Sequence, residues 1–248
     1  MSSRKEEKER LRQEREEAER AAAASENRRK RVFAVLGGLA LVAALVVIGI
    51  VALGGGDDDK DDGPGPGKTV NTDLPPKQTD DLDEAVKAAS CTFKEFPDEG
   101  NNHLPNREAT FDGYKTNPPT SGTHRPPPAA PDGVYDPGNS PAKEEWVHTL
   151  EHGRVIFMYK PGTPQQRIDQ LQKLMEEKFK DQDSGYKTVL MENNTKMPFE
   201  VAAVSWRRYV ACEKFTDKSF DALRAFRSEV VDDGTAPEGD FPWPFTGI

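Results

Sequence analysis

All four histidines of this 248-residue chain fall within one fifty-residue window. They are His103, His124, His148 and His152. A neutral imidazole is the side chain that proteins use most often to bind a metal ion. Zn²⁺ accepts four such nitrogens in a tetrahedron, whereas Cu²⁺ prefers a flatter arrangement. We therefore predict that the four rings are ligands of a copper or zinc site, and that binding weakens below about pH 6 because the rings take up protons.

Glu151 stands between two of these histidines, in the pentapeptide His148-Thr149-Leu150-Glu151-His152. On a helix, His148 and His152 share one face because they are four residues apart. His-x-x-Glu-His is also the zincin motif in inverted order, in which the glutamate activates metal-bound water. One alternative is therefore a zinc metallohydrolase with Glu151 as its catalytic base. Gly153 should end the helix at once, unlike the long helix of those enzymes, so we expect Glu151 to orient an imidazole instead.

A second alternative gives the histidines no metal. Each ring could cap a turn, stack on an aromatic ring or complete a hydrogen bond, and the protein would then be a non-catalytic interaction module of the cell envelope. The chain has no Gly-x-Ser-x-Gly motif and no phosphate-binding glycine loop, so other enzyme classes have less support than metal binding. No protein partner can be named from the sequence.

Residues 32–53 form 22 consecutive positions without a charged side chain. At 1.5 Å per residue, this length can span a bilayer core of ~30 Å as a helix. Four basic residues (28–31) precede the span and five aspartates follow it within residues 57–62. The positive-inside bias predicts a single-pass plasma membrane protein with a cytoplasmic N-terminus. The run is longer than the ~7–15 apolar residues of a cleaved signal peptide.

The rest of the chain divides by composition. Residues 1–31 are a charged tail with a net charge of +3, predicted to be helical and cytoplasmic, and the remainder carries −12. Residues 54–80 form a flexible acidic stalk rich in glycine and proline. Residues 81–248 are long enough for one compact extracytoplasmic domain. An acidic outer domain does not favour nucleic acid as a partner.

The only two cysteines, Cys91 and Cys212, lie on the predicted outer side, where thiols oxidise. We predict that they form a disulfide. Because the bond would close a loop of more than one hundred residues, its contribution to the free energy of unfolding could reach ~4–5 kcal/mol. Two buried free thiols are the alternative.

The domain is predicted to have an α+β fold, with a β-α-β-β-α core after a long loop region rich in proline and glycine. A short helix is expected over 83–89 and another over 141–152. An apolar strand, buried on both faces, is expected over 154–159. The remaining expected elements are a helix over 163–179, strands over 188–191 and 199–206 (the second extending to 212 in one interpretation), and a helix over 217–230.

Two motifs and the strand after them resemble a known family: the segment 117–124 (Asn-Pro-Pro-Thr-Ser-Gly-Thr-His), the segment 147–153 (Val-His-Thr-Leu-Glu-His-Gly) and the strand Val155–Tyr159. The likeness, over about residues 85–235, is to a largely bacterial family known only as the domain of unknown function numbered 3105. Members of that family resemble this chain in having one membrane anchor, a polar stalk and an extracytoplasmic domain. The resemblance implies that the domain lies outside the membrane on a single anchor. It transfers neither an activity nor catalytic residues.

Overall fold

The computed structural model of the chain describes residues 73–244. The predicted tail (1–31), membrane span (32–53) and most of the stalk (54–80) lie outside this part. Among the described residues, no helix has both the length and the apolar character needed to cross a membrane.

Six strands form one mixed sheet in the order β1-β6-β5-β3-β4-β2. β3 and β4 run parallel, as do β2 and β4, and the other neighbouring pairs are antiparallel. The helix α4 connects the parallel pair β3 and β4, as a parallel crossover requires. The strands are β1 (Cys91–Glu95), β2 (Gly133–Val134), β3 (Val155–Tyr159), β4 (Thr188–Glu192), β5 (Val201–Ser205) and β6 (Arg208–Cys212).

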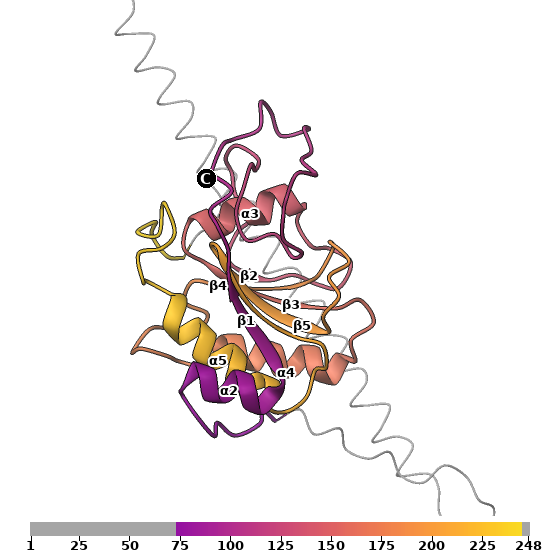
Figure 1. The fold of residues 1–248 in the computed structure, drawn as a ribbon, viewed down its shortest axis with the longest axis vertical. Helices are drawn as coiled ribbons and strands as arrows, with labels where there is room; N and C mark the ends of the chain where they lie inside the picture. The colour runs from indigo at the N-terminus through magenta and orange to yellow at the C-terminus, as the bar shows by residue number, and fades with distance from the viewer. Residues whose placement is uncertain (1–72, 245–248) are drawn as a thin grey trace, which may run out of the picture. The chain divides into compact units, whose positions relative to one another are not determined.

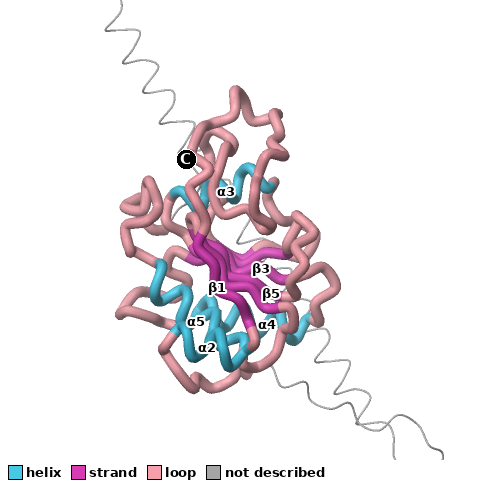
Figure 2. Tube along the Cα trace, viewed as in Figure 1, coloured by secondary structure: helices cyan, strands magenta, loops and turns pink. Residues whose placement is uncertain are grey.

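Four helices in the described part cover the two faces of this sheet. Figures 1 and 2 show α3 (Lys143–Glu151) and the long loops on one face, and the other three helices on the opposite face. Those three are α2 (Leu82–Ala89), α4 (Gln165–Glu176) and α5 (Ser219–Val230). The helix that carries the histidine pair is therefore separated from the other helices by the sheet.

The central strand β3 shows why both faces must be covered. All five of its side chains are buried, as the continuous apolar sequence predicts. Val155 and Phe157 pack in the core under α2, α4 and α5. Ile156 and Met158 point the other way and pack with Trp146 of α3. Alternation along the strand thus builds two apolar cores, and the second one seats α3 on the sheet.

The predicted α+β class is confirmed, with one correction to the order of elements. The segment predicted as one strand near 199–212 forms two, so the order after the histidine region is β-α-β-β-β-α. β5 and β6 are joined by a tight turn at Trp206-Arg207, where Arg207 has a φ of +63°. β1 and β2, which were not predicted, complete the two edges of the sheet.

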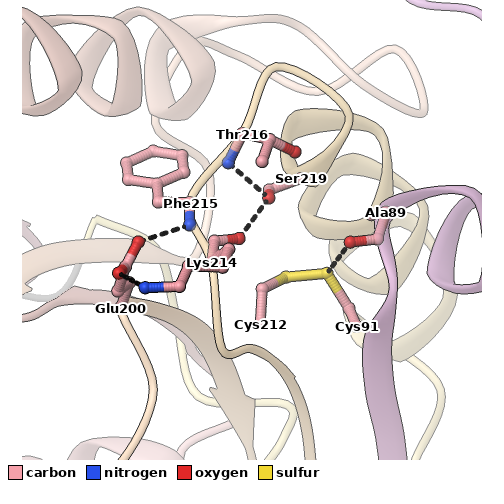
Figure 3. The surroundings of a disulfide bond; sticks show 8 residues. All are labelled: Ala89, Cys91, Glu200, Cys212, Lys214, Phe215, Thr216 and Ser219. Atoms are coloured by element: carbon pink, nitrogen blue, oxygen red, sulfur yellow. Dashed lines mark hydrogen bonds and ion pairs between the residues drawn. A yellow bond between two sulfur atoms is a disulfide. The ribbon is translucent and has the colours of Figure 1, made fainter.

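The predicted disulfide is confirmed. Cys91 of β1 and Cys212 of β6 lie directly opposite each other in the antiparallel ladder, and their sulfur atoms are bonded. Figure 3 shows the bond at the end of β1, beside the loop that leads into α5. Because β6 is the sole neighbour of β1 within residues 73–244, the bond covalently fixes an edge strand to the sheet.

Candidate metal centre

α3 contributes two of the site's side chains, His148 and Glu151. They are three residues apart, so they project from the same side of the helix, and Nε2 of His148 lies 3.8 Å from Oε2 of Glu151. Each residue is only 2 % exposed. The helix ends at Glu151, with Gly153 following at a φ of +75°, as the sequence predicted. The helix therefore places both groups at its buried C-terminal turn.

A short parallel backbone pairing brings His103 and His124 together. The amide of Leu104 donates to the carbonyl of His124 at 2.7 Å, and the amide of His124 donates to the carbonyl of Asn102 at 3.0 Å. This pairing places the two imidazole rings with their centroids 4.9 Å apart. His124 is completely buried, whereas His103 is exposed to solvent.

The loop that carries His124 is held against α3 by ionic contacts. Arg107 and Arg125 both donate to Oε1 of Glu145. Arg107 also donates to the carbonyls of Pro126 and Pro128. The amide of Arg125 donates to a carbonyl of α3 at 3.1 Å. These contacts fix the position of His124 relative to the helix.

Four side chains converge at this point: His103, His124, His148 and Glu151. Each offers one ligand atom, and these atoms all lie within 4.8 Å of one another. In a tetrahedral zinc site, ligand atoms ~2.0–2.2 Å from the metal are about 3.3–3.6 Å apart. One ion could therefore be bound if the widest pair moved together by roughly 1 Å. Three imidazoles and one carboxylate are a donor set that suits zinc or copper.

The contact between His124 and Glu151 is the most informative one in the group. Nδ1 of His124 lies 2.8 Å from the carbonyl oxygen of Gly122. A carbonyl only accepts, so Nδ1 carries a proton, and whenever the ring is neutral Nε2 therefore holds a lone pair. That nitrogen lies 2.9 Å from Oε2 of Glu151. Neither atom has an aligned hydrogen bond. Two buried lone pairs at this distance repel each other unless they share a proton or a metal ion.

Charge states within the group also suit a cation. Burial alone would raise the pKa of Glu151, but contacts with His124 and Asn101 outweigh burial and lower it, so the group is a carboxylate. The contact with His124 acts in this direction only when Nε2 carries a proton or a metal ion. Burial, together with the neighbouring rings of His124 and His152, lowers the pKa of His148 to about 3. This imidazole is therefore neutral near pH 7, and a metal ion would not have to displace a proton from it.

His152 contacts the C-terminal segment and is not one of the four converging residues. Its ring stacks on that of His148 at 4.8 Å, as expected for residues one turn apart. Its Nδ1 lies 3.2 Å from Oε2 of Glu238, and Phe241 packs against the ring with a centroid distance of 4.2 Å. The structure thus brings three of the four histidines together with Glu151, the residue that we expected only to orient an imidazole.

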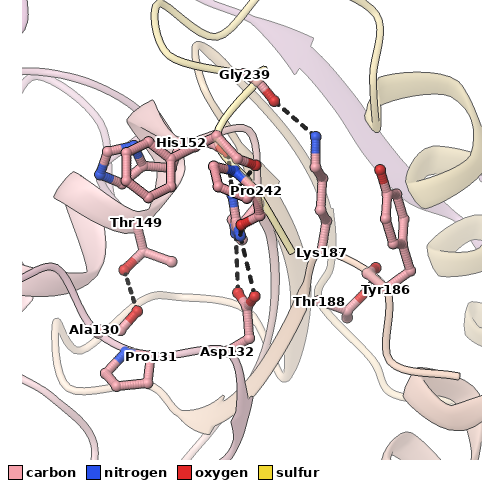
Figure 4. Close-up of polar contacts among 12 residues, drawn as sticks. Ala130, Pro131, Asp132, Thr149, His152, Tyr186, Lys187, Thr188, Gly239 and Pro242 are labelled. Atoms are coloured by element: carbon pink, nitrogen blue, oxygen red, sulfur yellow. Dashed lines mark hydrogen bonds and ion pairs between the residues drawn. The ribbon is translucent and has the colours of Figure 1, made fainter. Parts of the chain in front are cut away.

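A buried arginine that no sequence pattern singles out fixes this end of the site. The guanidinium of Arg154 donates to both carboxylate oxygens of Asp132, at 3.0 and 3.2 Å. It also donates to the carbonyls of His152, Phe241 and Pro242. Figure 4 labels three of these partners, Asp132, His152 and Pro242. The C-terminal segment is thereby tied to the residue that follows α3.

The fold and the cluster define a small α+β domain with a candidate metal centre on one face of its sheet. The chain belongs to the family described as "Protein of unknown function (DUF3105)", whose model matches residues 107–241. This confirms the resemblance. The matched range includes His124, His148 and Glu151 but begins after His103. No curated protein and no solved structure matches the chain.

Proposed function

We propose that the domain binds one transition-metal ion, zinc or copper, through His103, His124, His148 and Glu151. The observation that carries this proposal is the buried contact at 2.9 Å between Nε2 of His124 and Oε2 of Glu151, which are both acceptors when the ring is neutral. A divalent cation between them would turn their repulsion into two coordinate bonds. The neighbouring imidazoles would complete the ligand set.

Metal binding accounts for the cluster better than purely structural histidines do. Structural rings should have both nitrogens occupied by hydrogen bonds, because unpaired buried polar atoms are costly. Within the described part of the chain, Nε2 of His124 and Nδ1 of His148 have no aligned hydrogen-bond partner. Both atoms are therefore available to a metal ion, which favours metal binding over the interaction-module hypothesis.

The hydrolase alternative has less support from the geometry. A catalytic base needs a carboxylate oxygen free to take a proton from metal-bound water. One oxygen of Glu151 accepts from Asn101 at 2.7 Å, and the other is 2.9 Å from His124. Oε1 is thus occupied by Asn101, and Oε2 faces the imidazoles as a ligand atom would, so neither oxygen is placed to take a proton from metal-bound water.

The decisive experiment is a metal titration of the full chain after chelator treatment. Zn²⁺ and Cu²⁺ would each be added at pH 7 and followed by calorimetry and by thermal denaturation. We expect one ion per chain and, at a free metal concentration 100-fold above Kd, about 2.7 kcal/mol of added stability. Failure of both metals to bind would contradict the proposal.

We also propose that residues 32–53 anchor the domain outside the plasma membrane with the N-terminus in the cytoplasm. The uncharged run, the basic residues before it and the Cys91–Cys212 bond support this placement, since disulfides persist in oxidising compartments.

A membrane-impermeant amine reagent should label the domain on intact spheroplasts. Labelling only after lysis would contradict this orientation, and deletion of 32–53 should move the protein to the soluble fraction.

A further inference from the structure

The two oxygens of Glu151 have different partners. Oε1 accepts a hydrogen bond from the side-chain amide of Asn101 at 2.7 Å. Oε2 faces the imidazoles, 2.9 Å from Nε2 of His124 and 3.8 Å from Nε2 of His148. Glu151 is 2 % exposed, so these partners largely determine the orientation of its carboxylate. Oε1 is therefore held by a residue outside the cluster, and Oε2 remains available to a metal ion in the cluster.

The same backbone pairing that places the histidines also places Asn101. The amide of Gly122 donates to the carbonyl of Gly100 at 2.9 Å, one step before the pairing of His103 with His124. Side chains alternate along extended backbone, so Asn101 and His103 point to one side and Asn102 to the other. The loop therefore places His103, a candidate ligand, and Asn101, the partner of the candidate ligand Glu151, on the same side.

We infer that Asn101 is a positioning residue that fixes Glu151 as a one-oxygen ligand and so keeps the site four-coordinate. This inference rests on the proposed metal site. A carboxylate can bind a metal through one oxygen or through both. The amide of Asn101 occupies one of the two lone pairs of Oε1 and so competes with two-oxygen binding. Hydrogen-bond partners that orient ligands in this way contribute strongly to metal affinity.

The test compares Asn101→Ala with Asn102→Ala in the full chain. Asn102 is a matched control because it has the same side chain, is the next residue, is also exposed, and makes no side-chain hydrogen bond among the described residues. Zn²⁺ affinity would be measured by competition with a chelator. Co²⁺ would serve as a spectroscopic probe, because its visible absorption is intense when four-coordinate and weakens as the coordination number rises.

We expect Asn101→Ala to lower the Zn²⁺ affinity about 10- to 100-fold and to weaken the visible Co²⁺ bands. Asn102→Ala should match the wild-type chain in both measurements. Asn101→Leu, which keeps the side-chain shape without the donor, should behave like Asn101→Ala and replaces it if the alanine variant does not fold. Circular dichroism of the metal-free proteins checks folding.

The outcomes separate this inference from the proposed function. A wild-type chain that binds metal, with Asn101 variants unchanged in affinity and spectrum, overturns only the role of Asn101. Lower affinity with an unchanged Co²⁺ spectrum would show that Asn101 does not control coordination number, and would overturn the inference as stated. A wild-type chain that binds none of Zn²⁺, Co²⁺ and Cu²⁺ overturns both, and one that binds Cu²⁺ alone overturns the inference about Asn101 but leaves the proposed function standing.

Discussion

Replacing His148 with alanine is expected to lower the Zn²⁺ affinity of the full chain by about 10²–10³-fold, whereas His152→Ala should leave it within about threefold of the wild-type value. Four-ligand zinc sites contribute ~10–16 kcal/mol, so one ligand is worth about 2.5–4 kcal/mol. His148 belongs to the converging group, and His152 does not. A competition titration with a coloured chelator at pH 7 measures both affinities.

The two variants control for each other. Both remove an imidazole from the same end of one helix, the rings stack on each other, and the residues are 2 % and 4 % exposed. Their losses of packing in the metal-free protein should therefore be similar, and only the affinities should separate. Glu151→Gln should resemble His148→Ala. If His152→Ala instead lost as much affinity as His148→Ala and Glu151→Gln lost none, the four-histidine hypothesis would be the correct one.

The contrast between these histidines shows where sequence reasoning stops. The i and i+4 spacing predicts correctly that the rings of His148 and His152 lie side by side, and they do stack, although His152 directly follows the last helical residue. The spacing says nothing about what each nitrogen faces. Nδ1 of His152 faces Glu238, which is far along the chain. The approach of Asn101 to Glu151 is likewise set by a loop pairing that leaves no local pattern in the sequence.

The fold could be predicted where apolar periodicity is strong. β3 is buried on both faces, and the apolar face of α4 is buried, as expected. Apolar side chains at these spacings must be covered by other elements. The β5–β6 hairpin was missed because the apolar run continues through Trp206, and the turn uses Arg207 at positive φ without a glycine. β1 was missed because, as an edge strand, it buries little of its side-chain surface.

Removing the disulfide is the change expected to affect stability most. Cys91 and Cys212 are 121 positions apart, and the bond closes a loop that contains the whole candidate metal centre. On the chain-entropy account, a loop of this length contributes about 4–5 kcal/mol by restricting the unfolded chain. The double variant Cys91→Ala/Cys212→Ala should therefore unfold about 8–20 °C lower than the wild-type chain. Urea denaturation of the metal-free protein gives the corresponding free energy.

The wild-type chain under reducing conditions is the control for the side chains themselves, because it loses the bond without any substitution. Cys212 is completely buried, so the double variant also loses packing there, and the reduced wild-type chain should lie between the variant and the oxidised protein. Since β1 is an edge strand of the described sheet, reduction should expose its amides to hydrogen exchange first. A reduced chain within about 1 kcal/mol of the oxidised one would show that the sheet's own pairing holds β1, and that the bond contributes little.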